Sequence, residues 1–550
     1  MQLDQESNVV LMMGPPGCGK TTALVESARK AVRRYQRNDA LVIVSMTNAA
    51  ANELASRGLP VVRDHVGTLH AICYREMGRP ELVNGHIAEW NADNPGWEMA
   101  VSTRIRSPED DEEVSIERSS GGKGDDLLDQ YDLNRHQMIP RGAWTESVLA
   151  FAHLWEEWKR ENGLIDFTDM IERWYLDYEG MPFGASLLMV DEAQDFSKLE
   201  FSVVSKMGQY ADFVLICGDE DQCLYQWRGA DPESLINQTP RECRILDQSY
   251  RLPPQIHTHC QAWVHLISDR IEKPYAPYKG RGEGEVSQQS CNWHAPHELL
   301  SLHEQAEKQR KSLMILAACG YQLDPLIKRF REEGIAFANA YRPTKARWNP
   351  LSRPSRGIAT VDRLVSFRAP HEDETGRLTW TWDELRRWAS LVQVKGVFQR
   401  NTKARLKTDT PPTTTEDLPL DYIASLCDPA ALEPLLNGDL VWLLDHALDS
   451  HQARIDYFAR VHQKSGIHGW KVPENRPAPG VPTIGTIHSV KGGEADWVYV
   501  FPDLSYSGWE SWTGSIKSHD TVLRQFYVAV SRAKEHLFLG GGGSHQAVAW

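Results

Sequence analysis

The sequence contains, near its start, Asn8-Val-Val-Leu-Met-Met-Gly-Pro-Pro-Gly-Cys-Gly-Lys-Thr-Thr22, and this stretch decides the fold. Its opening, up to Met13, has the apolar character of a short buried strand, and a helical pattern follows to about Arg34. Leu-Val-Ile-Val at 41–44 predicts the next strand. The opening is therefore a βαβ unit, which predicts a parallel sheet.

The loop between the first strand and the helix predicts a nucleotide site. It matches G-x-x-x-x-G-K-[ST], in which glycines let backbone N–H groups surround phosphate oxygens. Lys20 would reach the outer phosphates, and the Thr21 hydroxyl would bind Mg²⁺. The alternative is a glycine turn without a ligand. The expected nucleotide-binding residues of the loop are Gly14, Pro15, Pro16, Gly17, Cys18, Gly19, Lys20, Thr21 and Thr22.

A second part of this site is predicted at Leu187-Leu-Met-Val-Asp-Glu-Ala-Gln-Asp195. An apolar strand that ends in two adjacent acids places one carboxylate at a metal and the other toward water. Asp191 is the expected Mg²⁺ ligand and Glu192 the expected general base. An acidic strand end alone is also typical of a solvated loop, but this one follows a phosphate-binding loop on the same predicted sheet.

Two arginines are candidates for cations that stabilise the γ-phosphate in the transition state of hydrolysis. They end the stretches Gln248-Ser-Tyr-Arg251 and Tyr527-Val-Ala-Val-Ser-Arg532. Both lie in the predicted second α/β lobe, so we expect them to reach the nucleotide only across an interface between two lobes. The alternative is that each is a surface or salt-bridged arginine.

Composition excludes several classes of protein. With 41% hydrophobic and 25% charged residues in 550, the chain is neither disordered nor fibrous. The apolar run Val9–Met13 is too short for a membrane span or a signal peptide, so we expect a cytoplasmic protein without a membrane partner. Nine scattered cysteines without a CxxC pair predict reduced thiols. The histidines and cysteines between 257 and 297 lack zinc-ligand spacing and are more typical of ordinary helix and core residues.

The chain is organised as interrupted α/β lobes. Apolar runs at 186–190 and 213–217 continue the first sheet, and strand-like runs at 312–317, 497–501 and 536–539 predict a second one. The predicted first lobe comprises residues 1–80 and 171–244, with a helical insertion at 81–170. The predicted second lobe comprises residues 245–345 and 481–550, with a helical insertion at 346–480.

These motifs, in this order, resemble those of superfamily 1 helicases of the UvrD/Rep/PcrA type. Asp191–Asp195 is similar to the family's D-E-x-Q-D, and the loop at Gly14 to motif I. Further similar stretches are Thr47–Leu54 (motif Ia), Gly67–His70 (Ib), Gly218–Ala230 (III), Leu246–Arg251 (IV), Thr486–Glu494 (V) and Arg524–Arg532 (VI). The resemblance implies two RecA-like P-loop lobes with parallel sheets, each carrying a mostly helical inserted subdomain.

The resemblance also implies roles for single residues. Gln222 would sense the γ-phosphate, Tyr250 would stack on adenine, and Glu494 would reach the ribose. Arg251 and Arg532 would act as arginine fingers. The implied single-stranded DNA contacts are Thr47, Asn48, Thr68, His70, Tyr225, Trp227, Arg228, Thr486 and His488.

Some of these implied roles have structural alternatives. Trp227 is the implied base-stacking platform. The alternative is that it is one more buried tryptophan of the core. For His70 and His488 the alternative is a structural histidine with satisfied hydrogen bonds.

Two features depart from the family pattern or add to it. The Leu-Asn-x-x-Gln element that usually precedes the P-loop does not occur in the thirteen residues before Gly14, which predicts weak discrimination between bases. Between Arg386 and Lys407 lie seven basic residues and no acid, with Trp388 and Phe398 interleaved. This stretch predicts a contact with duplex DNA or a junction, or else a solvated helix face without a partner.

The sequence as a whole predicts a monomeric, ATP- and Mg²⁺-dependent DNA helicase acting in DNA repair or replication, without identifying a loading partner. Its partners would be single-stranded DNA and single-strand/duplex junctions, with 3′ to 5′ movement implied by the resemblance. Since the net charge is −15, DNA contact should be confined to a local groove. The alternative is a translocase or protein-displacement factor without processive unwinding. A helicase–nuclease is disfavoured, because only eighteen residues follow Arg532.

Overall fold

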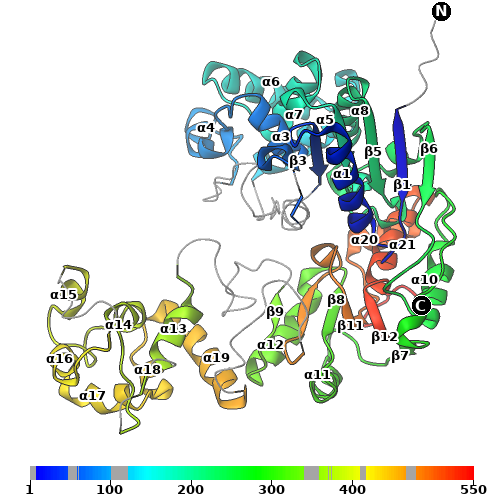
Figure 1. Ribbon diagram of the computed structural model, residues 1–550. Coiled ribbons are helices and arrows are strands. Elements are labelled where there is room, and N and C mark those ends of the chain that lie inside the picture. Colours follow the sequence, from blue (N-terminus) through cyan, green and yellow to red (C-terminus); the bar gives the residue numbers. More distant parts are fainter. Residues whose placement is uncertain are drawn as a thin grey trace, which may run out of the picture. The chain divides into compact units, whose positions relative to one another are not determined.

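The computed structural model describes residues 8–46, 58–59, 61–100, 122–339, 358–368, 371–372, 375–408, 416–465 and 479–550 (Figure 1). The chain divides into two compact units. The first comprises Met1–Gly284 with Glu510–Ser531, and the second comprises Glu285–Trp509 with Arg532–Trp550.

The first unit is built on a six-stranded parallel sheet in the order β3-β2-β4-β5-β1-β6. Its strands are β1 (Val9–Met13), β2 (Leu41–Ser45), β3 (Val66–Thr68), β4 (Leu187–Val190), β5 (Phe213–Gly218) and β6 (Glu242–Ile245). In Figure 1 the blue strand β1 lies between β5 and β6. Since all strands are parallel, their carboxyl ends lie along one edge of the sheet.

Helices cover both faces of this sheet, because alternate strand residues enter two cores. Leu11 and Met13 pack in the core that includes residues of α3, α7 and α8, whereas Val10 and Met12 pack in the core that includes residues of α1. The helices of the unit are α1 (Lys20–Tyr35), α3 (Leu69–Glu76), α4 (Ile87–Asp93), α5 (Lys123–His136), α6 (Glu146–Glu161), α7 (Phe167–Asp177), α8 (Lys198–Gln209), α9 (Pro232–Ile236), α10 (Pro254–Val264) and α21 (Ile516–Val530).

The helices α4, α5 and α6 have an aromatic core of their own. Trp90 contacts Trp155 edge-on, with ring centroids 4.8 Å apart, and Trp155 stacks on Trp158 at 5.9 Å. Beside this core, Arg135 and Lys159 form buried ion pairs with Asp166, the residue that caps α7. The Trp-rich stretch of the sequence is therefore a packed helical layer.

The second unit contains another six-stranded parallel sheet, in the order β7-β12-β11-β8-β10-β9. Its strands are β7 (Glu285–Gln288), β8 (Leu313–Ala317), β9 (Ala338–Asn339), β10 (Thr483–Thr486), β11 (Ala495–Val500) and β12 (Ala533–Leu539). Two parallel sheets with flanking helices confirm the predicted α/β class.

Helices of the second unit flank its sheet and fill the segment between β9 and β10. They are α11 (Glu298–Lys308), α12 (Asp324–Glu332), α13 (Thr360–Arg368), α14 (Trp382–Ala389), α15 (Thr402–Thr408), α16 (Leu420–Leu426), α17 (Pro429–Leu436), α18 (Leu440–Asp445) and α19 (Asp449–Ser465). A further helix, α20 (Tyr506–Thr513), spans the boundary of the two units. Of the helices in the described ranges, none combines the length and apolar character that crossing a bilayer requires.

The compact units divide the chain differently from the lobes expected from the sequence. Residues 245–284 and 510–531, assigned to the second lobe by pattern, belong to the first unit. The reason is packing: α10 lies against α21, and Trp263 Nε1 donates to the carbonyl of Leu523 at 2.9 Å. Ser268 Oγ also donates to Asp520 at 2.7 Å. The strands nevertheless form two separate parallel sheets. The assignment of lobes and insertions stays a prediction.

Candidate nucleotide and DNA site

The loop after β1 has the backbone that a phosphate-binding loop needs. Gly17 and Gly19 have φ values of 75° and 77°, which glycine adopts without a Cβ penalty. Gly14 N donates to Gly218 O at 3.1 Å, which ties the loop to the end of β5. Lys20 Nζ donates to the carbonyl of Gly14 at 2.7 Å, so the ammonium group folds back over the loop.

The loop opens directly into the N-terminus of α1. Gly19 is the N-cap, no side chain caps the helix, and its first turn carries no acidic residue. A helix start of this kind presents backbone N–H groups and a positive dipole end to an anion. Burial raises the pKa of the Cys18 thiol to about 12, so this thiol stays protonated within the loop.

A second segment of the first unit, Ser249–Arg251, lies directly on this loop. Tyr250 N donates to Gly17 O at 2.8 Å, and Ser249 Oγ donates to Pro16 O at 3.0 Å. The approach is so close that a Cβ on Gly17 would lie 2.4 Å from Cβ of Arg251. The structure therefore brings Tyr250 and Arg251 to the predicted phosphate loop.

The acidic motif follows β4 at the same edge of the sheet. Asp191 is buried, with 1% of its surface exposed, and its N–H donates to Val44 O at 2.8 Å. Glu192 has a φ of 53°, a left-handed conformation that is strained for a residue with a side chain. Its carboxylate accepts a 2.6 Å hydrogen bond from Gln194 Nε2, and Gln194 Oε1 accepts one from Asp219 N at 2.9 Å.

The loop after β5 holds Gln222 next to Asp219. Gln222 Nε2 donates to Asp219 Oδ2 at 2.6 Å, within a short 3₁₀ turn, Glu220–Gln222. In the sheet, β5 lies between β4 and β1, with Val190 opposite Ile216 and Met13 opposite Gly218. The phosphate loop, the acidic motif and Gln222 thus leave three adjacent strands at one edge.

Sequence reasoning missed two cations that support this loop. Lys273 forms ion pairs with all three acids of Asp219–Asp221, at 3.2 Å to Asp219 and 2.9 Å to Asp221. Arg270 pairs with Asp221 at 2.9 Å. Burial raises the pKa of Glu220 to about 7, and the three carboxylates raise that of Lys273. The available signal was the run of three acids after a buried strand, because buried carboxylates need cationic partners.

Among the implied DNA contacts, those after β3 have clear structural partners. Thr68 is the N-cap of α3, and its hydroxyl accepts from Ala71 N at 3.1 Å. His70 Nδ1 lies 3.9 Å from Glu200 Oε1, and burial lowers the pKa of His70 to about 4. Both residues therefore hold the first unit together, whatever else they contact. Thr47 and Asn48 lie outside the described residues.

Trp227 is not a buried core residue. It lies in the short turn Gln226–Arg228 with 50% of its surface exposed. The guanidinium carbon of Arg228 lies 5.9 Å from the ring centroid of Tyr225, so the cation and the ring are neighbours. Gly229, with a φ of 96°, packs against His136 of α5. This turn thus presents an indole surface, and α5 supports it from behind.

The remaining predicted residues belong to the second unit. Thr486 is buried at the end of β10, and its hydroxyl makes no hydrogen bond to any part of the chain that the structure describes. His488 is half-buried. Glu494 lies 3.5 Å from Lys534, and the buried Arg532 donates from Nη1 to Gly493 O at 3.3 Å.

The basic stretch 386–407 has several of its charges at the surface, whereas its aromatic rings are buried. Arg386, Arg387 and Lys395 are exposed. Trp388 and Phe398 are buried in the core of the second unit, so they cannot stack on bases. The surface of this stretch is therefore cationic without aromatic platforms.

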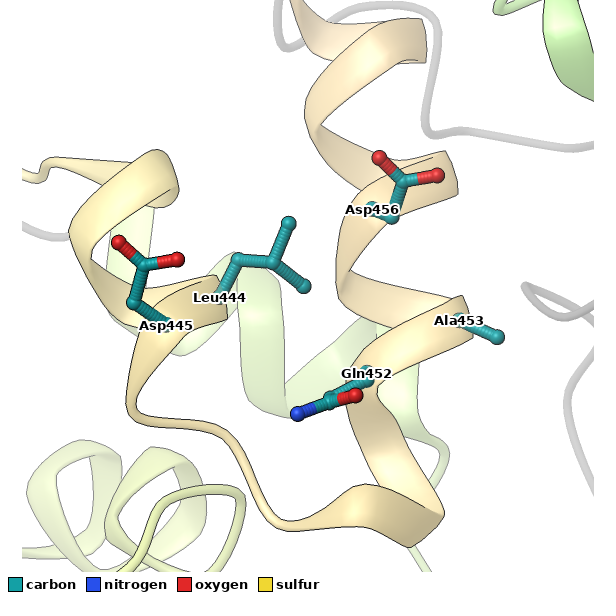
Figure 2. Close-up of a pocket in the computed structure, with 5 residues that line it drawn as sticks. All are labelled: Leu444, Asp445, Gln452, Ala453 and Asp456. Atoms are coloured by element: carbon teal, nitrogen blue, oxygen red, sulfur yellow. The ribbon is translucent and has the colours of Figure 1, made fainter.

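A hollow of about 400 Å³ is lined by residues of α18 and α19. Figure 2 shows these residues, which are Leu444, Asp445, Gln452, Ala453 and Asp456. None of the predicted site residues lines this hollow, and Asp456 is engaged with Arg460 at 3.1 Å. Within the described ranges, no three His, Cys, Asp or Glu side chains are grouped so as to hold a metal ion.

Comparison with known proteins agrees with the geometry of the first unit. Residues 2–242 match the family model described as the UvrD/REP helicase N-terminal domain. This part of the chain is therefore similar to the N-terminal domain of UvrD/Rep helicases. The predicted resemblance to superfamily 1 helicases of the UvrD/Rep/PcrA type is thereby confirmed.

Several curated proteins that this chain resembles bear helicase names. DNA helicase II of Haemophilus influenzae is 22% identical over 48% of this chain and 39% of its own length. ATP-dependent DNA helicase PcrA of Leuconostoc citreum is 23% identical over 50% of this chain and 39% of its own length. ATP-dependent DNA helicase Rep of Salmonella typhimurium is 26% identical over 41% of this chain and 36% of its own length. The chain thus spans well under half the length of these relatives.

Proposed function

We propose that this chain is an ATP-dependent DNA helicase that moves along single-stranded DNA in the 3′ to 5′ direction and unwinds duplex at junctions. One observation carries the proposal. The phosphate loop, the acidic motif and the Gln222 loop leave three adjacent parallel strands, β1, β4 and β5, at the same edge of one sheet. Ligands of parallel α/β sheets bind outside the carboxyl ends of the strands.

The residues present suit ATP and Mg²⁺. The loop offers backbone N–H groups and Lys20 to the phosphates. The Thr21 hydroxyl and the Asp191 carboxylate are oxygen donors, the ligands that Mg²⁺ prefers. When bound, Mg²⁺ would neutralise charge that develops on the phosphates. Glu192, oriented by its hydrogen bond from Gln194, would accept the proton of the attacking water.

Arginines complete the proposed site. Arg251 lies against the phosphate loop, and we assign it to the γ-phosphate. Arg532, from the second unit, is assigned as a second cation there. Glu494 is assigned to the ribose, and Tyr250 to the adenine.

A continuous set of contacts would couple hydrolysis to DNA. Glu192 is joined to Gln194, Gln194 to Asp219, and Asp219 to Gln222 by hydrogen bonds. Five residues beyond Gln222 stands the exposed indole of Trp227. We propose that loss of the γ-phosphate shifts Gln222 and thereby the stacking surface of Trp227.

The two sheets would be the cores of two RecA-like lobes that alternately close on ATP and release after hydrolysis. The helices α4 to α6 and α13 to α19 would be the inserted subdomains, and a single chain would suffice for movement.

A strand-displacement assay on 3′-tailed and 5′-tailed duplexes tests the proposal. Wild-type protein should separate the 3′-tailed substrate, with ATP and Mg²⁺ and not without them. Lys20→Ala should lose both DNA-stimulated ATPase and displacement while retaining single-strand binding. ATPase activity unchanged in Lys20→Ala would remove the phosphate-loop assignment. Hydrolysis and translocation without displacement on either tail would favour the translocase without processive unwinding.

A further inference from the structure

A tyrosine that the family motifs do not include lies beside Tyr250. It is Tyr278, in the segment Ala276–Arg281, which runs next to Ser249–Arg251. The two segments are joined by Tyr278 N donating to Leu252 O at 2.7 Å and Ser249 N donating to Ala276 O at 2.9 Å. Gln248 Nε2 also donates to Pro277 O at 3.0 Å. Tyr278 is thus held in register with Tyr250 by its backbone.

The two rings are neighbours and are tilted rather than stacked. Their centroids are 6.4 Å apart, and their planes are inclined by 55°. Tyr250 is 62% exposed, whereas Tyr278 is half-buried. A flat ring inserted between two others needs about 7 Å, twice the carbon contact distance of about 3.5 Å. Rotation of the exposed Tyr250 side chain, a fast motion, would open this gap.

The chain holds the ring of Tyr278 in place. A Cβ on Gly280 would lie 2.5 Å from the phenol end of this ring, so glycine is required for the ring to lie there. The guanidinium carbon of Arg281 lies 5.9 Å from the ring centroid, a cation–π contact. Tyr278 is therefore the more enclosed ring of the pair, and Tyr250 is the more exposed one.

We propose that Tyr278 and Tyr250 form an aromatic clamp that receives the base of the nucleotide. This inference rests on the proposed binding of ATP at the phosphate loop, and it names the residue that fixes the base there. Tyr250 N donates a hydrogen bond to Gly17 O, so the clamp lies next to the loop assigned to the phosphates. The flat group of a nucleoside triphosphate is its base, which the ribose joins to the phosphates. Because stacking uses only the face of a base, the clamp accepts adenine and guanine alike.

Calorimetric titration without DNA tests the clamp, with MgATP, MgGTP and Mg²⁺-tripolyphosphate as ligands. Tyr278→Ala should weaken the binding of ATP and of GTP about ten-fold, which corresponds to about 1.4 kcal/mol of binding free energy. Tripolyphosphate, which has no base, should bind the variant and the wild type equally. Tyr278→Phe keeps the ring and should restore wild-type nucleotide affinity.

Tyr175→Ala is the matched control. Tyr175 is also half-buried and contacts a cation, with Lys206 Nζ 5.8 Å from its ring centroid, and it should leave all three affinities unchanged. Unchanged ATP affinity in Tyr278→Ala overturns the clamp, and so does equal weakening of ATP and tripolyphosphate. If the wild-type protein binds neither ligand, the phosphate-loop proposal fails, and the clamp fails with it.

Discussion

Trp227 carries the proposed DNA contact through one side chain. Its exposed side chain lies on a turn that packs against α5 at Gly229, and we expect its removal to leave the nucleotide loops intact. Trp227→Ala should retain appreciable ATPase activity but lose strand displacement, because base stacking on an aromatic platform is worth about 1–3 kcal/mol. Trp227→Phe should restore most of the displacement. Equal unwinding by the wild type and Trp227→Ala would place the platform elsewhere.

His70 makes the stability of the first unit depend on pH. Burial lowers its pKa to about 4, and the groups around it are Glu200, His136 and Arg228. Since the folded-state pKa lies below the unfolded value of about 6.5, the neutral ring stabilises the fold above pH 6.5. This stability is lost as the pH falls toward 4, by up to about 3 kcal/mol.

Urea denaturation at pH 7 and pH 5 measures this effect. His70→Gln should show a smaller difference in unfolding free energy between the two pH values than the wild type. His153→Gln, at an exposed histidine of α6, should behave as the wild type. An identical pH dependence in His70→Gln would show that other groups cause the acid destabilisation.

At the scale of elements, the contact between the phosphate loop and Ser249–Arg251 is the most sensitive. Gly17→Ala adds a methyl group 2.4 Å from Cβ of Arg251 at a φ of 75°, so the two segments must separate. ATP affinity should fall more than ten-fold, because both Tyr250 and Arg251 move. Titration with MgATP measures the loss.

Gly163→Ala separates backbone strain from this contact. Gly163 also has a positive φ, 69°, but a Cβ there would meet no neighbouring atom within 4 Å. It should cost about 1 kcal/mol of unfolding free energy and leave ATP affinity unchanged. If Gly17→Ala behaved like Gly163→Ala, the approach of Ser249–Arg251 would have no role in nucleotide binding.

At the scale of the whole molecule, a net charge of −15 leaves the basic stretch 386–407 as the local candidate for duplex contact. Neutralising Arg386, Arg387 and Lys395 to glutamine should weaken binding to a junction and leave single-strand binding unchanged. The slope of log affinity against log salt concentration should fall by about 2 to 3, near one for each DNA phosphate that the variant no longer neutralises.

The matched control is a basic group on α1. Replacing Lys30, Arg33 and Arg34, which are also exposed, by glutamine removes the same charge. It should change junction affinity far less. Equal effects of the two triple variants would mean that 386–407 is a solvated helix face and that only overall charge matters.

The sequence alone determined the local structure of the candidate site. The strand, glycine loop and helix around Gly14–Thr21 follow from an apolar run, from glycines that allow positive φ, and from helical periodicity. The acidic motif after β4 follows from the same kind of pattern. These features depend on neighbouring residues, so their order along the chain was enough to predict them.

Only the tertiary structure decided which distant segments meet. Lys273 neutralises acids that lie about fifty residues earlier in the chain. Ser249 forms a hydrogen bond with Pro16, 233 positions away, and Tyr278 lies beside Tyr250. Residues 245–284 join the first unit because α10 packs on α21, and Trp388 is core rather than surface. Burial and pairing of this kind arise from the free energy of packing and of neutralising buried charge, and no local pattern encodes the partner.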